Sequence, residues 1–348
     1  MPDNTDILQD ILNTSIDNKK IFGASFTLQY QNKFWSGASG NLRPDSQYFI
    51  ASTTKLFTTA IILRFLSEKR LALDDKIEKY LDNETIRHLH VFNDRDESKN
   101  ITIRHLLAHT SGLPDYFQQK DKKGISLENS IMSGQDEFWS FEQAIVRTKS
   151  LPPLFIPGAQ GKAHYSDSNF QLLGKIIENT TGSSVSVNYD KYIFQPLQLR
   201  QTYLYHDIRD TRPQKLYYKN KVLHIPKAMA SFGPDGGIVS TSGEMLTFLK
   251  AFFNGQLFPH SYISQLQQWN KIFFPMQSGI GIHRFKLPWI FNPFGNAPEL
   301  IGHSGLSGAL AFCNPGKNLY ISGTVNQIAY PDTSFRLAIR LIQKMMKL

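Results

Sequence analysis

Residues 50–57, IASTTKLF, place a hydroxyl and an amine three positions apart, at Ser52 and Lys55, just where a long hydrophobic run begins. The apolar side chains of residues 56–66 cover nearly every face of the helix that we predict from Ser52 to about Lys69. A helix that is apolar on all sides is buried in the core of a protein. The segment therefore predicts a lysine at the start of a buried helix.

Ser52 and Lys55 would share one face of such a helix, because residues three apart lie side by side. A serine hydroxyl is a weak nucleophile and needs a base, and burial lowers the pKa of a lysine by disfavouring its charged form. We therefore predict that Ser52 is a nucleophile and Lys55 its general base. The alternative is that Ser52 only caps the helix while Lys55 extends to water.

Two later segments carry further polar side chains in a meaningful order. The first, AHYSDSNF, contains Tyr165 and Asp167 just before a strongly predicted helix. The second, IGHSGLSGAL, contains His303, Ser304 and Gly305 at the front of a strand pattern. A Ser-x-x-Lys helix, a tyrosine loop and a Lys/His-x-Gly strand, in this order, are typical of the three-part active site of penicillin-recognising serine enzymes.

On these motifs the chain resembles the serine β-lactamase-related superfamily. It is most similar to the branch of class C β-lactamases, R61-type D-alanyl-D-alanine carboxypeptidases and family VIII esterases. Three longer segments, residues 101–116, 155–182 and 233–249, are also similar to sequence blocks of that family. The resemblance covers most of the chain. It implies an antiparallel sheet flanked by helices, with an inserted, mainly helical domain.

The strand and helix patterns agree with an α+β fold of this kind. Strand patterns gather at both ends of the chain, and helical patterns lie between them. We therefore expect a discontinuous sheet domain, residues 1–72 and 226–348, and an inserted helical domain, residues 73–225. The active site is expected in the cleft between the two domains.

Several segments outside the motifs have simpler interpretations. Residues 74–81 are expected to be mostly helical, and the polar segments 93–100 and 118–137 to be exposed loops, the second at the edge of the site. GPDGGIV reads as a turn packed near the site. The aromatic segment 289–294, WIFNPF, is expected in the core or in the wall of the cleft.

The resemblance implies a role for each motif residue. Ser52 attacks a carbonyl and becomes acylated, while Lys55 and Tyr165 share the role of base. Lys55 would hold Tyr165 nearer to phenolate than its ordinary pKa of about 10 allows. Tyr165 then returns the proton to the leaving group. The backbone N–H groups of Ser52 and Leu306 would form the oxyanion hole.

Other residues are expected to line the site. His303 would lie opposite Tyr165, and Ser304 and Gly305 would contact the substrate, with Gly305 allowing close approach to the strand edge. Tyr116 is a candidate either for the wall of the cleft or for a packing aromatic.

Two residues depart from the family pattern. Asp167 stands where the family usually has Asn, and an ionised carboxylate cannot donate a hydrogen bond and favours a charged Lys55. It would therefore weaken the base or select a substrate that offers a donor. His303 replaces a lysine and is mostly neutral at pH 7, so it grips a substrate carboxylate less firmly. Both changes favour an esterase or amidase over an efficient β-lactamase.

The sequence predicts neither a metal nor a cofactor. His105 and His109 are four apart, but the glutamate of a His-Glu-x-x-His zinc site is missing, so we interpret both as structural. Cys313 is the only cysteine, which excludes an intrachain disulfide. The net charge of +9 includes no run of like charges, so nucleic-acid binding is not expected.

The partner expected from the sequence is a small-molecule or peptide substrate. The N-terminus, MPDNTDILQD, lacks the basic start and apolar core of a secretory leader, and no apolar run reaches the roughly 18 residues of a membrane span. We expect a soluble protein and favour the cytoplasm, with the periplasm and secretion left open. The sequence does not determine the oligomeric state.

Three functional hypotheses follow. The first is a serine hydrolase that forms an acyl-enzyme on an ester or an amide, with D-amino-acid peptides among the candidates. The second is a true β-lactamase or a penicillin-binding DD-carboxypeptidase. The third is a catalytically weak binding or scaffold protein, which only Asp167 favours.

Overall fold

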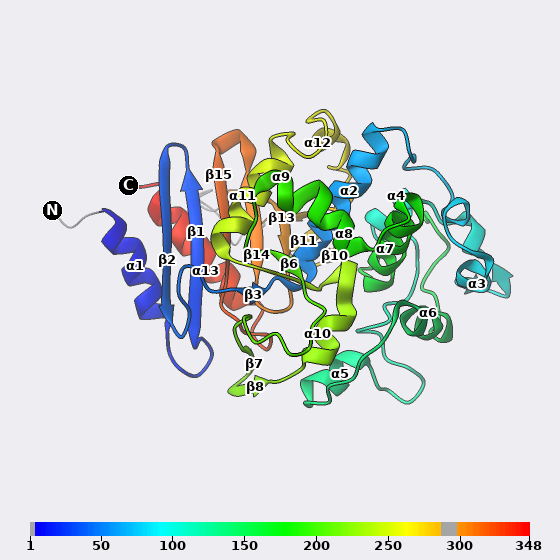
Figure 1. Ribbon diagram of the computed structural model, residues 1–348, viewed down its shortest axis with the longest axis horizontal. Helices are drawn as coiled ribbons and strands as arrows, with labels where there is room; N and C mark the ends of the chain where they lie inside the picture. The colour runs from blue at the N-terminus through cyan, green and yellow to red at the C-terminus, as the bar shows by residue number, and fades with distance from the viewer. Residues whose placement is uncertain (1–3, 287–297) are drawn as a thin grey trace.

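A computed structural model describes residues 4–286 and 298–348, and the predicted core or cleft segment 289–294 lies outside these residues. The largest element is an eight-stranded antiparallel sheet in the order β10-β11-β12-β13-β14-β15-β1-β2 (Figure 1). Its strands are β1 (Gly23–Tyr30), β2 (Lys33–Gly40), β10 (Asn270–Phe273), β11 (Met276–Ser278), β12 (His283–Phe285), β13 (Leu300–Ser304), β14 (Leu310–Asn314) and β15 (Leu319–Thr324).

Both ends of the chain contribute to this sheet. The N-terminal hairpin β1–β2 joins the C-terminal strands through β1, which pairs with β15 from Ser25 opposite Thr324 to Tyr30 opposite Leu319. The antiparallel sheet and the surrounding helices confirm the predicted α+β fold class. The division into domains at 72/73 and 225/226 stays a prediction.

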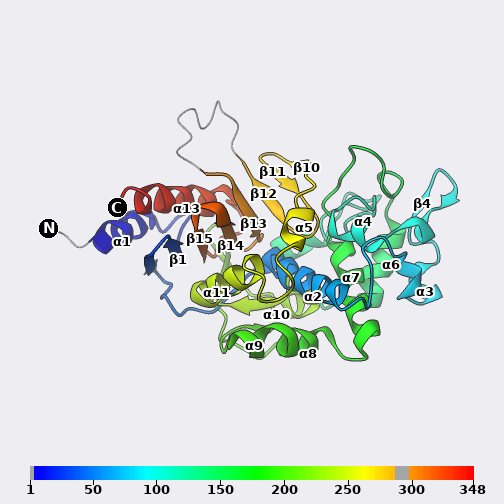
Figure 2. The same ribbon diagram turned by 90° about the horizontal axis from the view of Figure 1, so that it is seen from above.

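Helices cover both faces of the sheet (Figure 2). On one face lie α1 (Asn4–Ser15) and α13 (Asp332–Met345), side by side, and on the other lie α11 (Ser242–Phe253) and α2 (Lys55–Ser67). Helix α1 was not predicted from the sequence. A helix forms there because Leu8 and Leu12, four residues apart, share one apolar face.

A hydrophobic cluster holds the first layer to the sheet. Leu8 and Leu12 of α1 and Leu337 and Leu341 of α13 are all buried in it, together with Phe26 of β1. The two terminal helices thus share one core with the strands that they cover. The far ends of the chain are thereby tied to the same sheet.

The remaining helices lie mainly in the other half of the molecule. They are α3 (Asn83–Ile86), α4 (Ile103–Leu107), α5 (Leu127–Met132), α6 (Phe141–Ser150), α7 (Asp167–Thr181), α8 (Val185–Tyr189), α9 (Gln195–Leu197), α10 (Pro226–Phe232) and α12 (Tyr262–Gln265). Gly182 ends α7 in the left-handed conformation, at φ 71°, as glycine commonly does after the last turn of a helix.

Smaller sheets complete the fold. Strands β3 (Tyr48–Phe49), β9 (Ile238–Ser240) and β6 (Tyr203–Leu204) form one, in that order, while β4 (Val91–Phe92) pairs with β5 (Arg95–Asp96) and β7 (Leu216–Tyr218) with β8 (Lys221–Leu223).

Three local predictions were inaccurate. Residues 74–81 form only a short 3-10 turn, Ile77–Lys79, because Ile77 is their one fully buried apolar side chain and little else holds a helix there. The expected loop 93–100 contains strand β5, and the expected loop 118–137 contains helix α5.

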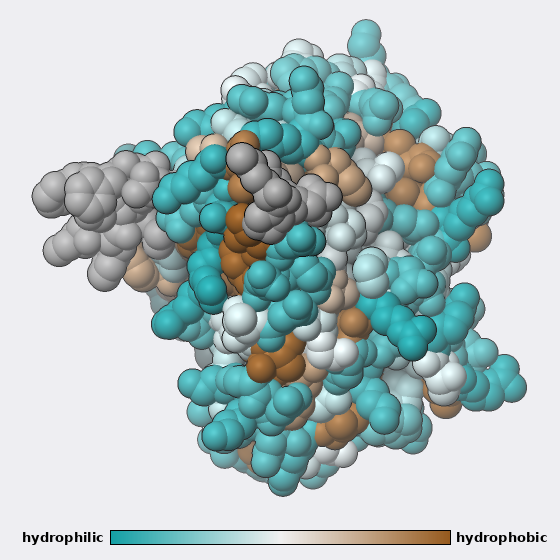
Figure 3. All heavy atoms as spheres, turned by 90° about the vertical axis from the view of Figure 1, so that its left-hand side faces the viewer, coloured by the Kyte–Doolittle hydropathy of each residue, from teal (hydrophilic) through white to brown (hydrophobic). Residues whose placement is uncertain are grey.

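The surface is largely polar where it can be seen from the side of α1 and β2. Figure 3 shows hydrophilic side chains over most of this face, with hydrophobic ones in small separate groups. Within residues 4–286 and 298–348, no helix combines the length and the apolar character that crossing a bilayer requires.

The shared core under α13 predicts the cost of truncating its side chains. Replacing Leu341 with Ala should lower the free energy of unfolding by roughly 2–5 kcal/mol, because a fully buried side chain leaves a cavity. Arg340→Ala, on the exposed side of the same helix, should change it by about 0.5 kcal/mol or less. Urea denaturation followed by circular dichroism measures both, and equal effects would contradict the packing described.

Candidate active site

Ser52 lies in a sharp turn between a strand and a buried helix. Strand β3 leads into a 3-10 turn, Ala51–Thr54, and α2 begins only at Lys55. The prediction that the α-helix starts at Ser52 is therefore wrong. Ala51 has a φ of 45°, in the left-handed region that few non-glycine residues adopt. In a 3-10 turn residues three apart eclipse one another, and Lys55 Nζ donates to Ser52 Oγ at 3.3 Å.

The side chain of Lys55 is fully buried. Its ammonium lies 2.6 Å from Asp167 Oδ1 and donates to the carbonyl oxygen of Asp235 at 2.6 Å, besides its contact with Ser52. The alternative prediction, in which Lys55 extends to water, is therefore wrong. The GPDGGIV turn does pack against the site, as predicted, through the Asp235 carbonyl.

The expected decrease in the pKa of Lys55 is also wrong. Burial lowers the pKa of its ammonium, but the charge of Asp167 and the nearby Tyr165 and Asp235 more than offset this, so the pKa is raised. Desolvation was expected to dominate, but the Asp167 carboxylate at 2.6 Å outweighs it. The expectation that Asp167 favours a charged Lys55 is confirmed.

Tyr165 completes the group around Ser52. Lys55 Nζ lies 5.1 Å from the centroid of its ring, and Tyr165 lines both hollows together with Ser52. Burial raises the pKa of Tyr165, the charge of Asp167 raises it further, and Lys55 only partly compensates. Tyr165 is thus held as a neutral phenol rather than close to phenolate, which corrects the expectation from the sequence.

Two further carboxyl groups surround the pair of Lys55 and Asp167. Burial and the charge of Asp167 raise the pKa of both Asp115 and Asp235, which holds them toward their neutral forms. Asp235 Oδ2 accepts a hydrogen bond from the Tyr116 hydroxyl at 2.8 Å. The buried charge of the site is therefore concentrated in one ion pair.

Tyr116 is fully buried beneath the site. Its ring packs against Phe117 and Trp139, and its hydroxyl is used by Asp235. The structure thus places Tyr116 as a packing aromatic that orients Asp235, the second of the two roles expected for it, and not in the wall of either hollow.

The loop after β13 is attached directly to the segment before Ser52. A Cβ atom at Gly305 would lie 2.3 Å from the carbonyl oxygen of Ile50, and Ser307 Oγ donates to the carbonyl oxygen of Phe49 at 2.6 Å. Gly305 is thus required by the protein's own backbone, a reason that differs from the approach of a substrate expected from the sequence. Ser304 lies at the end of β13 and lines the hollow beside it.

Ser52 and Leu306 are both close to this attachment. Both residues line the two hollows described below, and among the described residues neither N–H has a hydrogen-bond acceptor. Two free N–H groups beside a nucleophile are the arrangement that an oxyanion hole requires.

His303 lies on the Tyr165 side of the site, with its ring centroid 6.4 Å from that of Tyr165. Its Nδ1 is 2.8 Å from the Ser304 carbonyl oxygen, which can only accept, so Nδ1 carries the proton. Burial lowers the pKa of His303 well below its ordinary value and keeps it neutral, as expected. The ring stacks on that of His283 at 3.9 Å, a neighbour that the sequence did not reveal.

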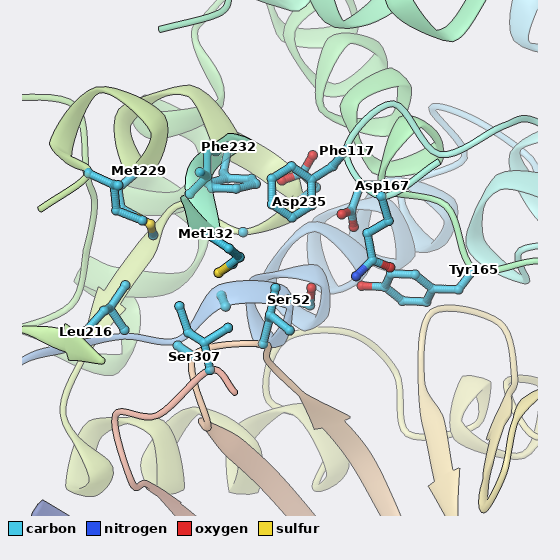
Figure 4. Close-up of a pocket in the computed structure, with 17 residues that line it drawn as sticks. Ser52, Phe117, Met132, Tyr165, Asp167, Leu216, Met229, Phe232, Asp235 and Ser307 are labelled. Atoms are coloured by element: carbon cyan, nitrogen blue, oxygen red, sulfur yellow. The ribbon is translucent and has the colours of Figure 1, made fainter. Parts of the chain in front are cut away.

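Two hollows meet at Ser52 and share Gln118, Tyr165 and Leu306 as walls. The smaller, shown in Figure 4, has a volume of about 70 Å³ and includes Asp167. Its apolar walls are Phe117, Ile131, Met132, Leu216, Ile225, Met229, Phe232 and Ile328.

The larger hollow has a volume of about 780 Å³ and includes His283, His303 and Ser304. Its apolar walls include Phe273, Pro275, Met276, Phe285, Phe335 and Ile339. Residues Gln118, Ile131 and Met132 come from segment 118–137, which confirms that this segment edges the site.

The histidines 105 and 109 do not form a metal site. His105 Nδ1 accepts from the Thr102 N–H at 3.3 Å at the start of α4, whereas His109 stacks on Tyr165. Within the described ranges, no three or more His, Cys, Asp or Glu side chains are arranged to hold a metal ion.

Sequence reasoning missed four residues of this site: Asp115, Gln118, Asp235 and His283. Asp115 and Asp235 lie inside two segments that are similar to blocks of the family, SGLPDY and GPDGGIV, so their position in these segments could have indicated them. His283 lies in an ordinary strand pattern. It faces the site only because β12 pairs with β13, opposite Gly302.

Comparison with known proteins agrees with this site. The family model described as Beta-lactamase matches residues 8–344. The protein flp of Staphylococcus aureus (strain MW2) is 28% identical over 269 residues, which cover 75% of this chain and 48% of flp. A putative D-alanyl-D-alanine carboxypeptidase of Escherichia coli (strain K12) is 26% identical over 317 residues, 79% of this chain and 67% of that protein.

Among solved structures, a D-stereospecific amidohydrolase from Streptomyces sp. superposes with a TM-score of 0.78 at 25% identity, over 94% of this chain and 95% of that one. The chain belongs to the Beta-lactamase family. It spans about half the length of the flp proteins that it matches.

The ion pair of Lys55 and Asp167 predicts how activity depends on pH. Because Asp167 raises the pKa of both Lys55 and Tyr165, a step that needs either group deprotonated should speed up as the pH rises into the alkaline range. Asp167→Asn should lower both pKa values and move this limb of the kcat/KM profile down by about 1–3 pH units. The exposed control Asp207→Asn should leave the profile in place. An unshifted Asp167→Asn profile would contradict the assignment.

The contact of Gly305 with Ile50 predicts a second effect. Gly305→Ala would push the loop away from Ser52, and misplacing one N–H by about 1 Å should cost roughly 100-fold in kcat. Gly243→Ala is a matched control, because a Cβ atom there meets no other atom within 4 Å. Steady-state kinetics compares the two variants, and similar activities would refute the requirement for a glycine.

Proposed function

We propose that the chain hydrolyses esters or amides through an acyl-enzyme at Ser52. The observation that carries this proposal is the contact of Ser52 Oγ with Lys55 Nζ, at the point where two hollows and two free N–H groups meet. A cap serine on an ordinary helix would have neither a buried lysine nor hollows on both sides.

The proposed reaction proceeds in two steps. Ser52 Oγ forms a bond to the carbonyl carbon, the bond from that carbon to the leaving group breaks, and the serine proton passes through Tyr165 to the leaving group. The N–H groups of Ser52 and Leu306 stabilise the oxygen that becomes negative. Water then attacks the acyl-enzyme, releases a carboxylic acid and restores the Ser52 hydroxyl.

The resting state is not the reactive state in this proposal. Lys55 is an ammonium paired with Asp167, and Tyr165 is a neutral phenol. A base forms when one of these groups loses its proton. Asp167 makes this loss rare near pH 7 by raising the pKa of both groups, and burial raises the pKa of Tyr165 further. A substrate group that donates to Asp167 would draw its charge away from Lys55 and ease this loss.

The polar groups of the site guide the choice of substrate. Asp167 lines the smaller hollow as a carboxylate and can only accept hydrogen bonds, so it favours an acyl group that offers an N–H donor. His303 is neutral and cannot offset a carboxylate on the leaving group. Both features support an amide or ester substrate without a carboxylate beside the scissile bond. The Streptomyces neighbour, a D-stereospecific amidohydrolase, adds support for amides.

A second candidate is a penicillin-binding carboxypeptidase, as the name of the Escherichia coli relative suggests. The neutral His303 counts against it. A third is a binding protein with weak turnover, which the ion pair of Lys55 with Asp167 favours because it keeps the base protonated.

Intact-protein mass spectrometry tests the proposal. The protein is mixed separately with a short-chain aryl ester, a pair of D- and L-amino-acid amides and a penicillin, with Ser52→Ala as the control. We expect rapid turnover of the ester and of one amide, with a transient mass increase that Ser52→Ala abolishes. A stable penicillin adduct at Ser52 would point instead to the carboxypeptidase candidate. Neither an adduct nor turnover with any reagent would favour the binding protein.

A further inference from the structure

His109 occupies an unusual position next to the site. It follows the short helix α4, its side chain is buried, and its φ of 57° places the backbone in the left-handed region. Such a conformation costs a non-glycine residue energy and persists only where surrounding contacts hold it. Its ring lies near Phe170 of α7 and His283 of β12, and its other contacts join it to the loop that carries Tyr165.

Three contacts join His109 to this loop. The His109 carbonyl oxygen accepts from the His164 N–H at 2.8 Å, and its Nδ1 accepts from the Ser166 N–H at 3.1 Å. Its imidazole stacks on the Tyr165 ring, with centroids 4.6 Å apart and planes 30° apart. A single residue therefore holds the backbone on both sides of Tyr165 and one face of the phenol.

The orientation of the imidazole is fixed as well. Because the Ser166 N–H can only donate, Nδ1 is the acceptor and the ring proton lies on Nε2. The Asn169 amide lies 3.1 Å from the same Nδ1, and its Oδ1 accepts from the Ser111 hydroxyl at 2.6 Å, which sets the amide's direction. The ring cannot flip without losing these partners.

We propose that His109 is the positioning residue of Tyr165, which sets the height and the plane of its phenol above Ser52. The inference rests on the proposed function, since it assigns Tyr165 the transfer of the proton to the leaving group. It goes beyond that function by naming the residue that makes the transfer geometrically possible. Burial lowers the pKa of His109, so the imidazole adds no charge beside Lys55.

Two variants separate the stacking of the His109 ring from the hydrogen bond that its Nδ1 accepts. His109→Phe keeps a ring for stacking but leaves the Ser166 N–H without its acceptor. His109→Asn keeps an acceptor near the position of Nδ1, tolerates the left-handed conformation and loses the ring. His105→Asn is the matched control, since His105 lies one turn earlier and contacts the start of α4 rather than the tyrosine loop.

The substrates are an aryl ester and an anilide with the same acyl group. A nitrophenolate leaves without a proton, whereas an anilide nitrogen must receive one, so a misplaced Tyr165 should harm the anilide reaction far more. For His109→Phe we expect kcat for the anilide to fall about 100-fold at a nearly unchanged KM, and kcat for the ester to fall less than about tenfold. His109→Asn should lie between this variant and the wild type, and Tyr165→Phe should show the same preference for the ester.

Equal losses for ester and anilide, or none, in both variants would overturn the inference, since a merely structural role lowers both reactions together. Crystal structures of the variants give a readout independent of turnover. A Tyr165 ring in an unchanged position in both variants would also overturn it. A displaced ring would support it even if neither substrate were hydrolysed, and that failure would count against the proposed function alone.

Discussion

The buried ion pair of Lys55 with Asp167 is the interaction around which the site is arranged. An ammonium without a partner in the interior would be expensive, and a carboxylate at 2.6 Å removes most of that cost. The Lys55 ammonium donates its other hydrogen bonds to Ser52 Oγ and to the carbonyl oxygen of Asp235. Because the pair is held by α2, α7 and the turn before β9, any displacement of these elements changes the protonation of the site.

The same site requires close contact between distant parts of the chain. Gly305 lies against the carbonyl oxygen of Ile50, and Ser307 is bonded to Phe49, so the end of β13 and the start of α2 act as one rigid unit. The loop of Tyr165 is fixed independently, through His109. Ser52 and Leu306 thus share one support, and Tyr165 reaches Ser52 from a second, each support having its own hydrogen bonds.

The sequence predicted the parts of this arrangement that depend on spacing. Ser52 and Lys55 are close because three residues separate them, and the terminal strand patterns correctly indicated one sheet. Properties that depend on contacts between distant residues were missed. The pKa of Lys55 was predicted in the wrong direction because the sequence does not give its distance to Asp167, which lies 112 positions away in the chain. His283 could not be recognised because only strand pairing brings it beside His303.

The pairing of β1 with β15 has a consequence for how the chain reaches this structure. These strands are nearly three hundred residues apart in sequence, so the hairpin β1–β2 cannot find its neighbour until the C-terminal end has been synthesised. Until then β1 exposes an open edge, which is a site where other chains can add. Folding of the large sheet is therefore expected to finish only after β15 has been synthesised, and to be sensitive to crowding by other nascent chains.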